Sequence, residues 1–537
     1  MACGWAASGG LFKLLSSRIA AAARRATLNV NLENRVNDPE QINTPEQDAE
    51  AQASVASTTD ATEEASAARG RKRRRKRDRR RRIDGKKALV AVISAFAIGC
   101  FVFTLIVQWR LSLASESLVE IGEPTPIEAV GGASKATGAI TADVTYSSIV
   151  TDDGEDATET IEWNDDWFFA DSSEYNHKIA RAGIVLSAMA NSESVYYQTY
   201  SDSQDYMKHT LAKLGFDNVS TASYKYRSKV IDQLSEVFSK QGTDVTAYTI
   251  ASKNITNSQT GENKLLVMVA IRGSYGTEWF SNLTMGLRID KGDYGLNKDD
   301  HTGFSEAATE LQSQIYEYLK NLGELDELGN VSLFLCGHSR GAAIANLTAN
   351  VLDKIDSAAV EASPDSGLDM DAWDQAHINK KSIYAYCFAT PELTADTECR
   401  DDTYNNIFNI LNPADIVPRM PLSAWGYDRY GIDLWLPEYG SNGFDQQFNA
   451  VKAKFREHIR CDTKSSPTDV GDVDKIVSDI AQIAPTLSDF QTPLGVVKSL
   501  GAILDGHDIV RIIHSHAPDL YSAWMETIEP SDLRTSR

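Results

Sequence analysis

Cysteine is scarce in this sequence, and metal-site spacings and internal repeats are missing. The 537 residues include six cysteines, with no CxxC pair and no cysteine–histidine spacing typical of a metal site. Of these, Cys399 and Cys461 could form a disulfide. No internal repeat is present. The mean hydropathy of −0.31 excludes a protein with many membrane-spanning helices. A hydrophobic content of 42% excludes a chain that is disordered throughout.

The acidic total charge hides two segments of opposite sign. A formal net charge of −22 would argue against binding to nucleic acid or anionic lipid. Residues 1–110, however, contain 20 Lys and Arg against 11 Asp and Glu, a net charge of +9, so residues 111–537 carry −31. The total therefore says little about the partners of either segment.

One long apolar run lies at the boundary between these segments. Residues 88–109 (ALVAVISAFAIGCFVFTLIVQW) contain no charged side chain and end in Trp109, a residue type common at membrane interfaces. A helix of this length, roughly 33 Å, could cross a hydrocarbon core of about 30 Å. We therefore predict one transmembrane helix. A buried core helix fits the polar flanks poorly, and a cleaved signal peptide would be shorter and nearer to Met1.

The basic run before this helix predicts its orientation. Residues 69–82 (RGRKRRRKRDRRRR) are almost wholly cationic, whereas residues 111–123 contain no basic side chain. The positive-inside rule then places a disordered tail, residues 1–87, in the cytoplasm and everything after residue 109 outside the cell membrane. At the membrane surface the basic run is expected to contact anionic lipid headgroups rather than nucleic acid.

Beyond the helix, we expect a polar stalk at residues 110–165 and a folded domain at residues 166–530. In this domain short apolar runs alternate with helical patterns, which indicates an α/β fold with a mostly parallel sheet covered on both faces. The predicted strands are residues 245–251, 265–271, 331–336, 382–388 and 407–411. The predicted helices are residues 174–190, 205–214, 304–322 and 341–355.

A short motif between one predicted strand and the helix after it contains a candidate catalytic residue. The sequence GHSRG, residues 337–341, is a G-x-S-x-G motif with a predicted strand before it and a helix of small residues after it. Its glycines allow the backbone to turn tightly. The turn lifts the hydroxyl of Ser339 off the edge of the sheet. Ser339 is therefore the candidate nucleophile, with an ordinary structural turn as the alternative.

A serine nucleophile needs a general base, which in turn needs an orienting acid. In this architecture the chain order is Ser, then Asp or Glu, then His. Asp415 directly follows the predicted strand at residues 407–411, so its carboxylate is expected at the sheet edge where α/β proteins bind ligands. The histidines that follow this acid are His458, His507, His514 and His516.

Four blocks of the sequence occur in the order typical of one family. They are AIRGS at residues 270–274 with EWFSNL shortly after it, HTGF at residues 301–304, GHSRG at residues 337–341 and DIVPRMP at residues 415–421. Across roughly residues 245–524 the chain thus resembles the class 3 (fungal-type) triacylglycerol lipases. The last block is the most specific, since it matches over seven residues. The resemblance implies an α/β-hydrolase fold.

The resemblance also implies a Ser-Asp-His triad. Ser339 would be the nucleophile and Asp415 the orienting acid. The family's base precedes an aromatic residue near the C-terminal end, and His516, with Tyr521 after it, fits this best. The alternatives to this base are His507 and His514.

The resemblance further implies an oxyanion hole and a lid. Ser274 and the backbone N–H of Arg340 would form the oxyanion hole. Residues 275–287 would cover an apolar acyl site, with ordinary core packing of their apolar side chains as the alternative. Arg340 and Ala342 stand where the family usually has other residues in its elbow. The side chain of Arg340 is expected to point to solvent or to pair with the acidic surface, with recognition of an anionic acyl group as the alternative. The long interval between acid and base predicts an insertion around residues 423–499.

We therefore predict a membrane-anchored, exported serine ester hydrolase that acts on acyl esters, with lipids as the substrate class implied by the resemblance. The mechanism needs no metal or cofactor. Two alternatives stay open. One is a different hydrolase on the same site, such as a polysaccharide deacetylase or a thioesterase. The other is a catalytically inactive surface protein with a hydrolase fold.

Overall fold

The structure is a computed structural model, and part of the chain is described in it. The residues that it describes are 124–129, 137–148, 150, 156–199, 205–222, 224, 246–273, 299–300, 302–323, 328–356, 378, 380–504 and 507–536. The chain divides into two units, residues 1–118 and 119–537, and all described residues belong to the second. The predicted tail, basic run and membrane helix lie outside the described residues. Among the helices that are described, none is both long and apolar enough to cross a membrane.

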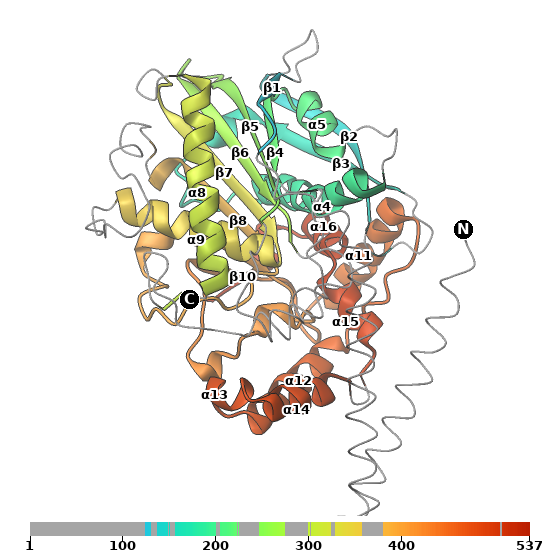
Figure 1. The fold of residues 1–537 in the computed structure, drawn as a ribbon. Coiled ribbons are helices and arrows are strands. Elements are labelled where there is room, and N and C mark those ends of the chain that lie inside the picture. The colour runs from blue at the N-terminus through green and yellow to red at the C-terminus, as the bar shows by residue number, and fades with distance from the viewer. Residues whose placement is uncertain are drawn as a thin grey trace, which may run out of the picture. The chain divides into compact units, whose positions relative to one another are not determined.

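The centre of the second unit is a nine-stranded mixed sheet (Figure 1). Its order is β1-β4-β5-β6-β7-β8-β9-β10-β11. Strands β6 to β10 pair in parallel, whereas β1, β4 and β5 at one side and β11 at the other pair antiparallel. The bounds are β1 Glu128–Ala129, β4 Asn218–Ala222, β5 Tyr248–Thr256, β6 Asn263–Ile271, β7 Val331–His338, β8 Ile383–Phe388, β9 Ile407–Leu411, β10 Ile432–Trp435 and β11 Arg534–Ser536.

The predicted parallel sheet is thus confirmed for the central strands only. Parallel neighbours need a crossover, which a helix usually supplies, whereas antiparallel neighbours can be joined by a short turn. Residues 257–262 form such a turn between β5 and β6, closed by a hydrogen bond from Asn257 N to Glu262 O at 2.8 Å. This stretch lacks the apolar spacing of a helix, so β5 returns antiparallel to β6.

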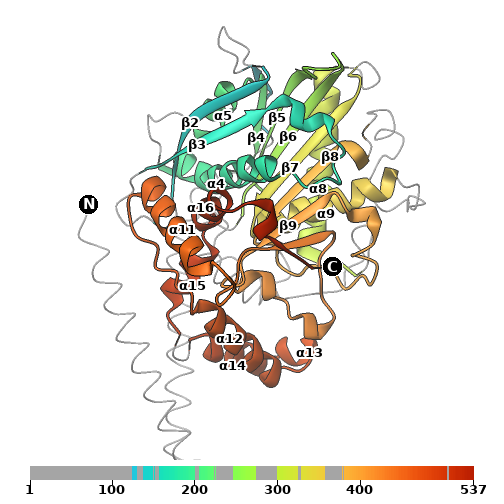
Figure 2. The same cartoon turned by 180° about the vertical axis from the view of Figure 1, so that it is seen from behind.

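Helices cover both faces of the sheet (Figures 1 and 2). Helices α8 (Thr302–Leu322) and α9 (Arg340–Asp356) pack on one face, and α4 (His177–Thr199), α11 (Phe444–Ile459) and α16 (Pro518–Thr527) pack on the other. The alternation of the strands divides their side chains between the two cores. In β7, for example, Leu333 and Leu335 face α8 and α9, while Phe334 and Cys336 face α4. Strand β7 is buried along its whole length, which fixes its end in the middle of the fold.

Residues expected in the stalk form part of this fold. Strands β2 (Ala139–Ser147) and β3 (Asp156–Asn164) pair antiparallel in a second, two-stranded sheet. Their buried side chains, among them Tyr146, Ile161 and Trp163, join the core around α4. Alternate residues of β3 are buried, but one of the buried positions is Glu159, which weakens the apolar alternation by which a strand is predicted. The expectation of a stalk reaching residue 165 therefore differs from the structure.

The predicted insertion consists mostly of helices. Helices α12 (Asp469–Ile483), α13 (Leu487–Phe490) and α14 (Pro493–Leu504) share a small core with residues 416–422 and lie together below the sheet in both views (Figures 1 and 2). Helix α11, in contrast, packs into the main core against α16. Cys399 and Cys461, the candidate disulfide pair, are not joined to each other.

Buried polar side chains connect the two-stranded sheet to α16. Glu159 in β3 accepts hydrogen bonds from the hydroxyls of Tyr146 and Ser522, and Asp519 in α16 accepts one from Ser148 at 3.1 Å. Both carboxyl groups are almost completely buried. Burial, and to a smaller extent the nearby Glu159, raise the pKa of Asp519 to about 7.

We expect an Asp519→Asn substitution to remove part of the pH dependence of stability. The pKa of Asp519 in the folded chain, about 7, exceeds the unfolded value of about 3.9. Its stabilising contribution is therefore complete below about pH 4 and is lost as the pH rises through 7. Between pH 5 and pH 8 the wild type should lose roughly 2 to 3 kcal/mol more of its free energy of unfolding than the variant, measured by urea denaturation.

The exposed Asp445, in the first turn of α11, provides the control. An Asp445→Asn variant should keep the pH dependence of the wild type. If the Asp519→Asn variant keeps it too, the buried carboxyl group does not hold a proton as we expect.

Candidate active site

The candidate nucleophile lies in the sharp turn between β7 and α9. Ser339 has a φ of 58°, in the left-handed region, which costs energy for a residue with a side chain and is typical of a nucleophile elbow. Backbone packs directly on backbone here, because a Cβ on Gly341 would lie 2.3 Å from the carbonyl oxygen of Ile271 at the end of β6. Glycine at position 341 therefore lets α9 begin against β6.

Three of the predicted site residues are hydrogen-bonded to one another. Nε2 of His516 lies 3.0 Å from Oγ of Ser339, and Nδ1 of His516 lies 2.8 Å from Oδ2 of Asp415. All three side chains are buried. Because a carboxylate only accepts, Nδ1 carries the ring proton and donates it to Asp415, which leaves Nε2 to accept the hydrogen of the serine hydroxyl. This arrangement can move a proton from Ser339 to His516.

Asp415 has two further partners that hold its carboxylate in place. Its Oδ1 accepts from the backbone N–H of Val417 at 2.9 Å, and its Oδ2 accepts from the hydroxyl of Tyr521 at 2.8 Å. Burial, with the nearby Asp415, raises the pKa of Tyr521 well above its usual range, so the hydroxyl keeps its proton and remains a donor. The sequence pointed to Tyr521 only as an aromatic residue after the base. Its contact with the acid could not be read from spacing.

The other candidate histidines lie elsewhere. Nδ1 of His514 accepts from the backbone N–H of Lys464 at 3.3 Å, and Nδ1 of His507 lies 3.3 Å from Asp472. His458 pairs with Glu526 through Nε2 at 2.9 Å. Of the four candidate histidines, His516 is therefore the one that the structure places beside Ser339.

The predicted oxyanion hole is only partly described. Arg340 is the first residue of α9, directly after the nucleophile, so its backbone N–H lies at a helix N-terminus. Its side chain is 8% exposed, so the expectation that it points to solvent was wrong. The reason is that α9 is buried from residue 340 to residue 353, its first turn included. Ser274 and the predicted lid, residues 275–287, lie outside the described residues.

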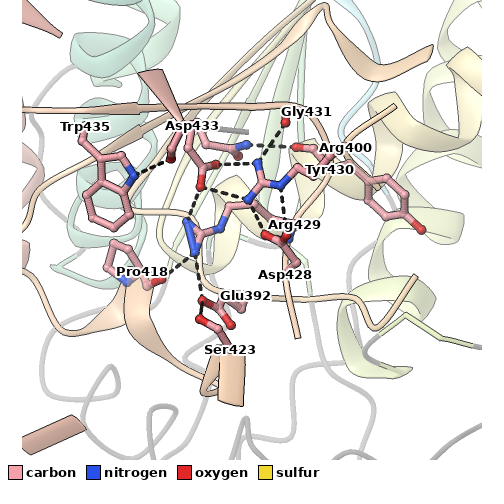
Figure 3. A network of polar contacts seen from close by, with 12 residues as sticks. Glu392, Arg400, Pro418, Ser423, Asp428, Arg429, Tyr430, Gly431, Asp433 and Trp435 are labelled. Carbon is pink, nitrogen blue, oxygen red and sulfur yellow. Dashed lines mark hydrogen bonds and ion pairs between the residues drawn. The ribbon is translucent and has the colours of Figure 1, made fainter. Parts of the chain in front are cut away.

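A buried arginine fixes the loop that follows the acid (Figure 3). Arg429, 2% exposed, donates to the carbonyl oxygen of Pro418 at 2.6 Å. It also lies 3.5 Å from Glu392 and 3.6 Å from Asp433. Since Pro418 is three residues after Asp415, this contact ties the acid's loop to the strand β10 region.

A second guanidinium group shares one of these acids, Asp433. Arg400 donates to both carboxylate oxygens of Asp433, at 2.9 Å each, and pairs with Asp428 as well (Figure 3). Burial raises the pKa of Glu392 to about 7, and Arg429 opposes part of this rise. The two arginines and three acids thus compensate one another's charge. Water is largely excluded from Arg429, Glu392 and Asp433, whereas 41% of the Asp428 side chain is exposed.

We expect an Arg429→Met substitution to destabilise the fold strongly. Removing one member of a buried group of charges leaves the others uncompensated, which typically costs about 3 to 5 kcal/mol of the free energy of unfolding. The matched control is Arg534→Met, because Arg534 contacts Glu438 at 2.6 Å on the surface, where 60% and 41% of the two side chains are exposed. An exposed pair contributes less than about 1 kcal/mol. Equal losses in the two variants, measured by urea denaturation, would contradict the role given to Arg429.

In the part of the chain that is described, no group of three or more His, Cys, Asp or Glu side chains is placed to hold a metal ion. The polar groups at the elbow are of the kinds that acyl transfer requires. They comprise a hydroxyl, a base that can accept its proton, an acid that orients the base, and a backbone N–H at a helix N-terminus.

Comparison with known proteins supports the resemblance stated above. The family described as Lipase (class 3) matches residues 268–425. This segment contains the end of β6, the elbow and Asp415, but not His516. Residues 268–425 thus match the class 3 lipases, and the predicted resemblance is confirmed over this segment. No curated protein matches the chain.

Several solved structures of lipases are similar to parts of the chain. A triacylglycerol lipase with a serine protease triad is 18% identical over 36% of this chain and 63% of its own, with a TM-score of 0.27. A Rhizomucor miehei lipase in complex with its propeptide is 17% identical over 36% of this chain and 51% of its own, with a TM-score of 0.24. The mono- and diacylglycerol lipase of Aspergillus oryzae is 18% identical over 51% and 85%, with a TM-score of 0.31. The chain therefore spans less than two thirds of the first two lipases.

Proposed function

We propose that this chain is a serine ester hydrolase that cleaves acyl esters of lipids through an acyl-enzyme on Ser339. The observation that carries the proposal is the buried hydrogen-bonded series Ser339–His516–Asp415, with distances of 3.0 and 2.8 Å, at the end of the central strand β7. The match of residues 268–425 to the class 3 lipases supports lipids as the class of substrate.

The geometry supports a two-step mechanism. As the hydroxyl of Ser339 attacks the ester carbonyl, Nε2 of His516 would take its proton, and Asp415 would stabilise the imidazolium that forms. His516 would then give this proton to the departing alcohol. A water molecule, activated by the same histidine, would hydrolyse the acyl-enzyme, release the carboxylic acid and restore Ser339.

The negative charge that develops on the carbonyl oxygen needs donors. The backbone N–H of Arg340 at the start of α9 is one candidate, and the positive end of the helix dipole favours an anion at the same place. Ser274, which follows Gly273 at the end of β6, is the second candidate from the resemblance. A single donor of this kind typically contributes about 3 kcal/mol of transition-state stabilisation.

The probe for this proposal is a fluorophosphonate that labels activated serines. The wild type should be labelled, and Ser339→Ala should not. His516→Ala should lower the labelling rate and esterase activity by about 1,000-fold or more, because Ser339 would lose its base. His514→Ala and His507→Ala serve as matched controls and should stay within a few-fold of the wild type. Absence of wild-type labelling above Ser339→Ala would show that the chain is not a serine hydrolase.

Nitrophenyl esters of increasing chain length then test the substrate class. A lipid hydrolase should prefer esters of medium or long acyl chains over acetate. A strict preference for acetate would favour a polysaccharide deacetylase instead, and a preference for acyl thioesters would favour a thioesterase.

We also propose that residues 88–109 anchor this enzyme in the cell membrane, with the unit at residues 119–537 outside and the basic run against anionic headgroups. The charge asymmetry around the apolar run supports this orientation. Protease added to intact cells should then digest the outer unit and spare a tag placed at residue 1. Protection of both parts, or digestion of both, would contradict this topology.

A further inference from the structure

One buried side chain contacts two of the segments from which the catalytic site is built. Asn191 in α4 is 2% exposed. Its Oδ1 accepts from the backbone N–H of Gly273 at 2.6 Å, and its Nδ2 lies 3.4 Å from Nδ1 of His338. Gly273 comes directly before Ser274, and His338 comes directly before Ser339. A single amide thus links the end of the strand that leads to the oxyanion segment with the end of the strand that carries the nucleophile.

The donor and acceptor in each hydrogen bond of Asn191 follow from the other contacts of His338. Nε2 of His338 lies 2.8 Å from the carbonyl oxygen of His516, which can only accept, so Nε2 carries the proton. Burial, with the nearby His516, lowers the pKa of His338 well below its usual value, so the ring is neutral. Nδ1 is then an acceptor, and Asn191 donates to it through its amide N–H. The oxygen of the same amide is left to accept from Gly273, which is the arrangement observed.

These bonds form one continuous series across the site. It runs from the backbone of Gly273 through Asn191 to His338, and from His338 to the backbone of His516, whose ring lies 4.7 Å from the ring of His338. The segments for the oxyanion donors, the nucleophile and the base are therefore connected through a residue of α4. Asn191 lies outside the segment that matches the lipase family.

The spacing at Gly273 shows how closely these segments must fit. A Cβ at this position would lie 2.5 Å from the carbonyl oxygen of His338 and 3.2 Å from Oδ1 of Asn191. The backbone just after β6 therefore packs directly against the elbow, with the amide of Asn191 at the same point. Reaction rates depend steeply on such distances, since a misplacement of about 1 Å can cost on the order of 100-fold in rate.

We infer that Asn191 is a positioning residue, which holds the end of β6 and the nucleophile elbow at the separation that the reaction needs. The inference rests on the proposed function, because it assigns Asn191 to the rate of that reaction. It acts through Gly273 and His338 and does not itself contact the reacting atoms.

The first test compares two substitutions with a control on the same helix. Asn191→Leu removes both hydrogen bonds, whereas Asn191→Asp keeps an acceptor for Gly273 but cannot donate to His338. We expect Asn191→Leu to lower kcat for a nitrophenyl ester by about 10- to 100-fold with KM within about threefold, and Asn191→Asp to lower kcat by an intermediate amount. The control is Ser187→Ala, because the buried Ser187, about one turn earlier in α4, donates to Gly183 O at 2.7 Å and contacts the thiol of Cys336 in β7, but has no hydrogen bond to Gly273 or His338 among the described residues.

Rates are expressed per active protein, counted by fluorophosphonate labelling at completion. Ser187→Ala should then have the kcat of the wild type, even if its stability is lower. If Asn191→Leu also has the wild-type kcat per labelled molecule, Asn191 only stabilises the fold and the inference is overturned. If the leucine variant does not fold, Asn191→Asp decides in the same way. Failure of the proposed function looks different, because the wild type itself would not be labelled.

A double-mutant cycle tests the route through His338. His338→Phe removes the acceptor of Asn191 and the donor to His516 together. If Asn191 acts partly through this ring, Asn191→Asp should reduce kcat by a smaller factor in the His338→Phe background than in the wild type. Equal factors in the two backgrounds would contradict the link between the amide and the elbow.

Discussion

The close approach of three backbone segments at the end of β7 is the constraint on which the site depends. Ser339 adopts a φ of 58° there, and the first turn of α9 lies against the end of β6 at Gly341. A strained turn of this kind persists only where its surroundings fix it. Strand β7 is buried on both faces, and β6 and β8 pair with it in parallel. The nucleophile is therefore held at the end of a fully buried strand.

Around this turn, polar side chains from other elements set the remaining distances. Tyr521 and the N–H of Val417 hold Asp415, while Asn191 links the ends of two strands. Each of these partners is buried and hydrogen-bonded, which a polar group in a core requires. A network with defined donors and acceptors tolerates few alternative geometries, so it favours one arrangement of the reacting groups.

The sequence predicts those parts of the site that can be recognised from short patterns of neighbouring residues. Ser339 and Asp415 follow buried strands directly, and such strands can be recognised from apolar runs alone. Partners such as Asn191 and Arg429 could not be predicted, because an isolated polar residue in a helix or a loop does not show what it contacts. The pairing of β2 with β3 was missed for a related reason, since Glu159 occupies a buried position that an apolar residue would have marked. The burial of Arg340 likewise depends on how α9 packs.

The placing of His516 shows how an insertion can be tolerated between two residues that must meet. The histidine lies 101 positions after Asp415, yet their atoms are 2.8 Å apart. Two contacts hold its helix, α15 (Ile509–His516), at the correct end of the sheet: Asn412 donates to Ser515 O at 2.9 Å, and Ser515 donates to Asp469 at 3.2 Å. Asp469 begins α12, so the inserted helices themselves brace the base. The match to the lipase family ends at residue 425, and the geometry of the base is therefore secured by parts of the chain that the match does not include.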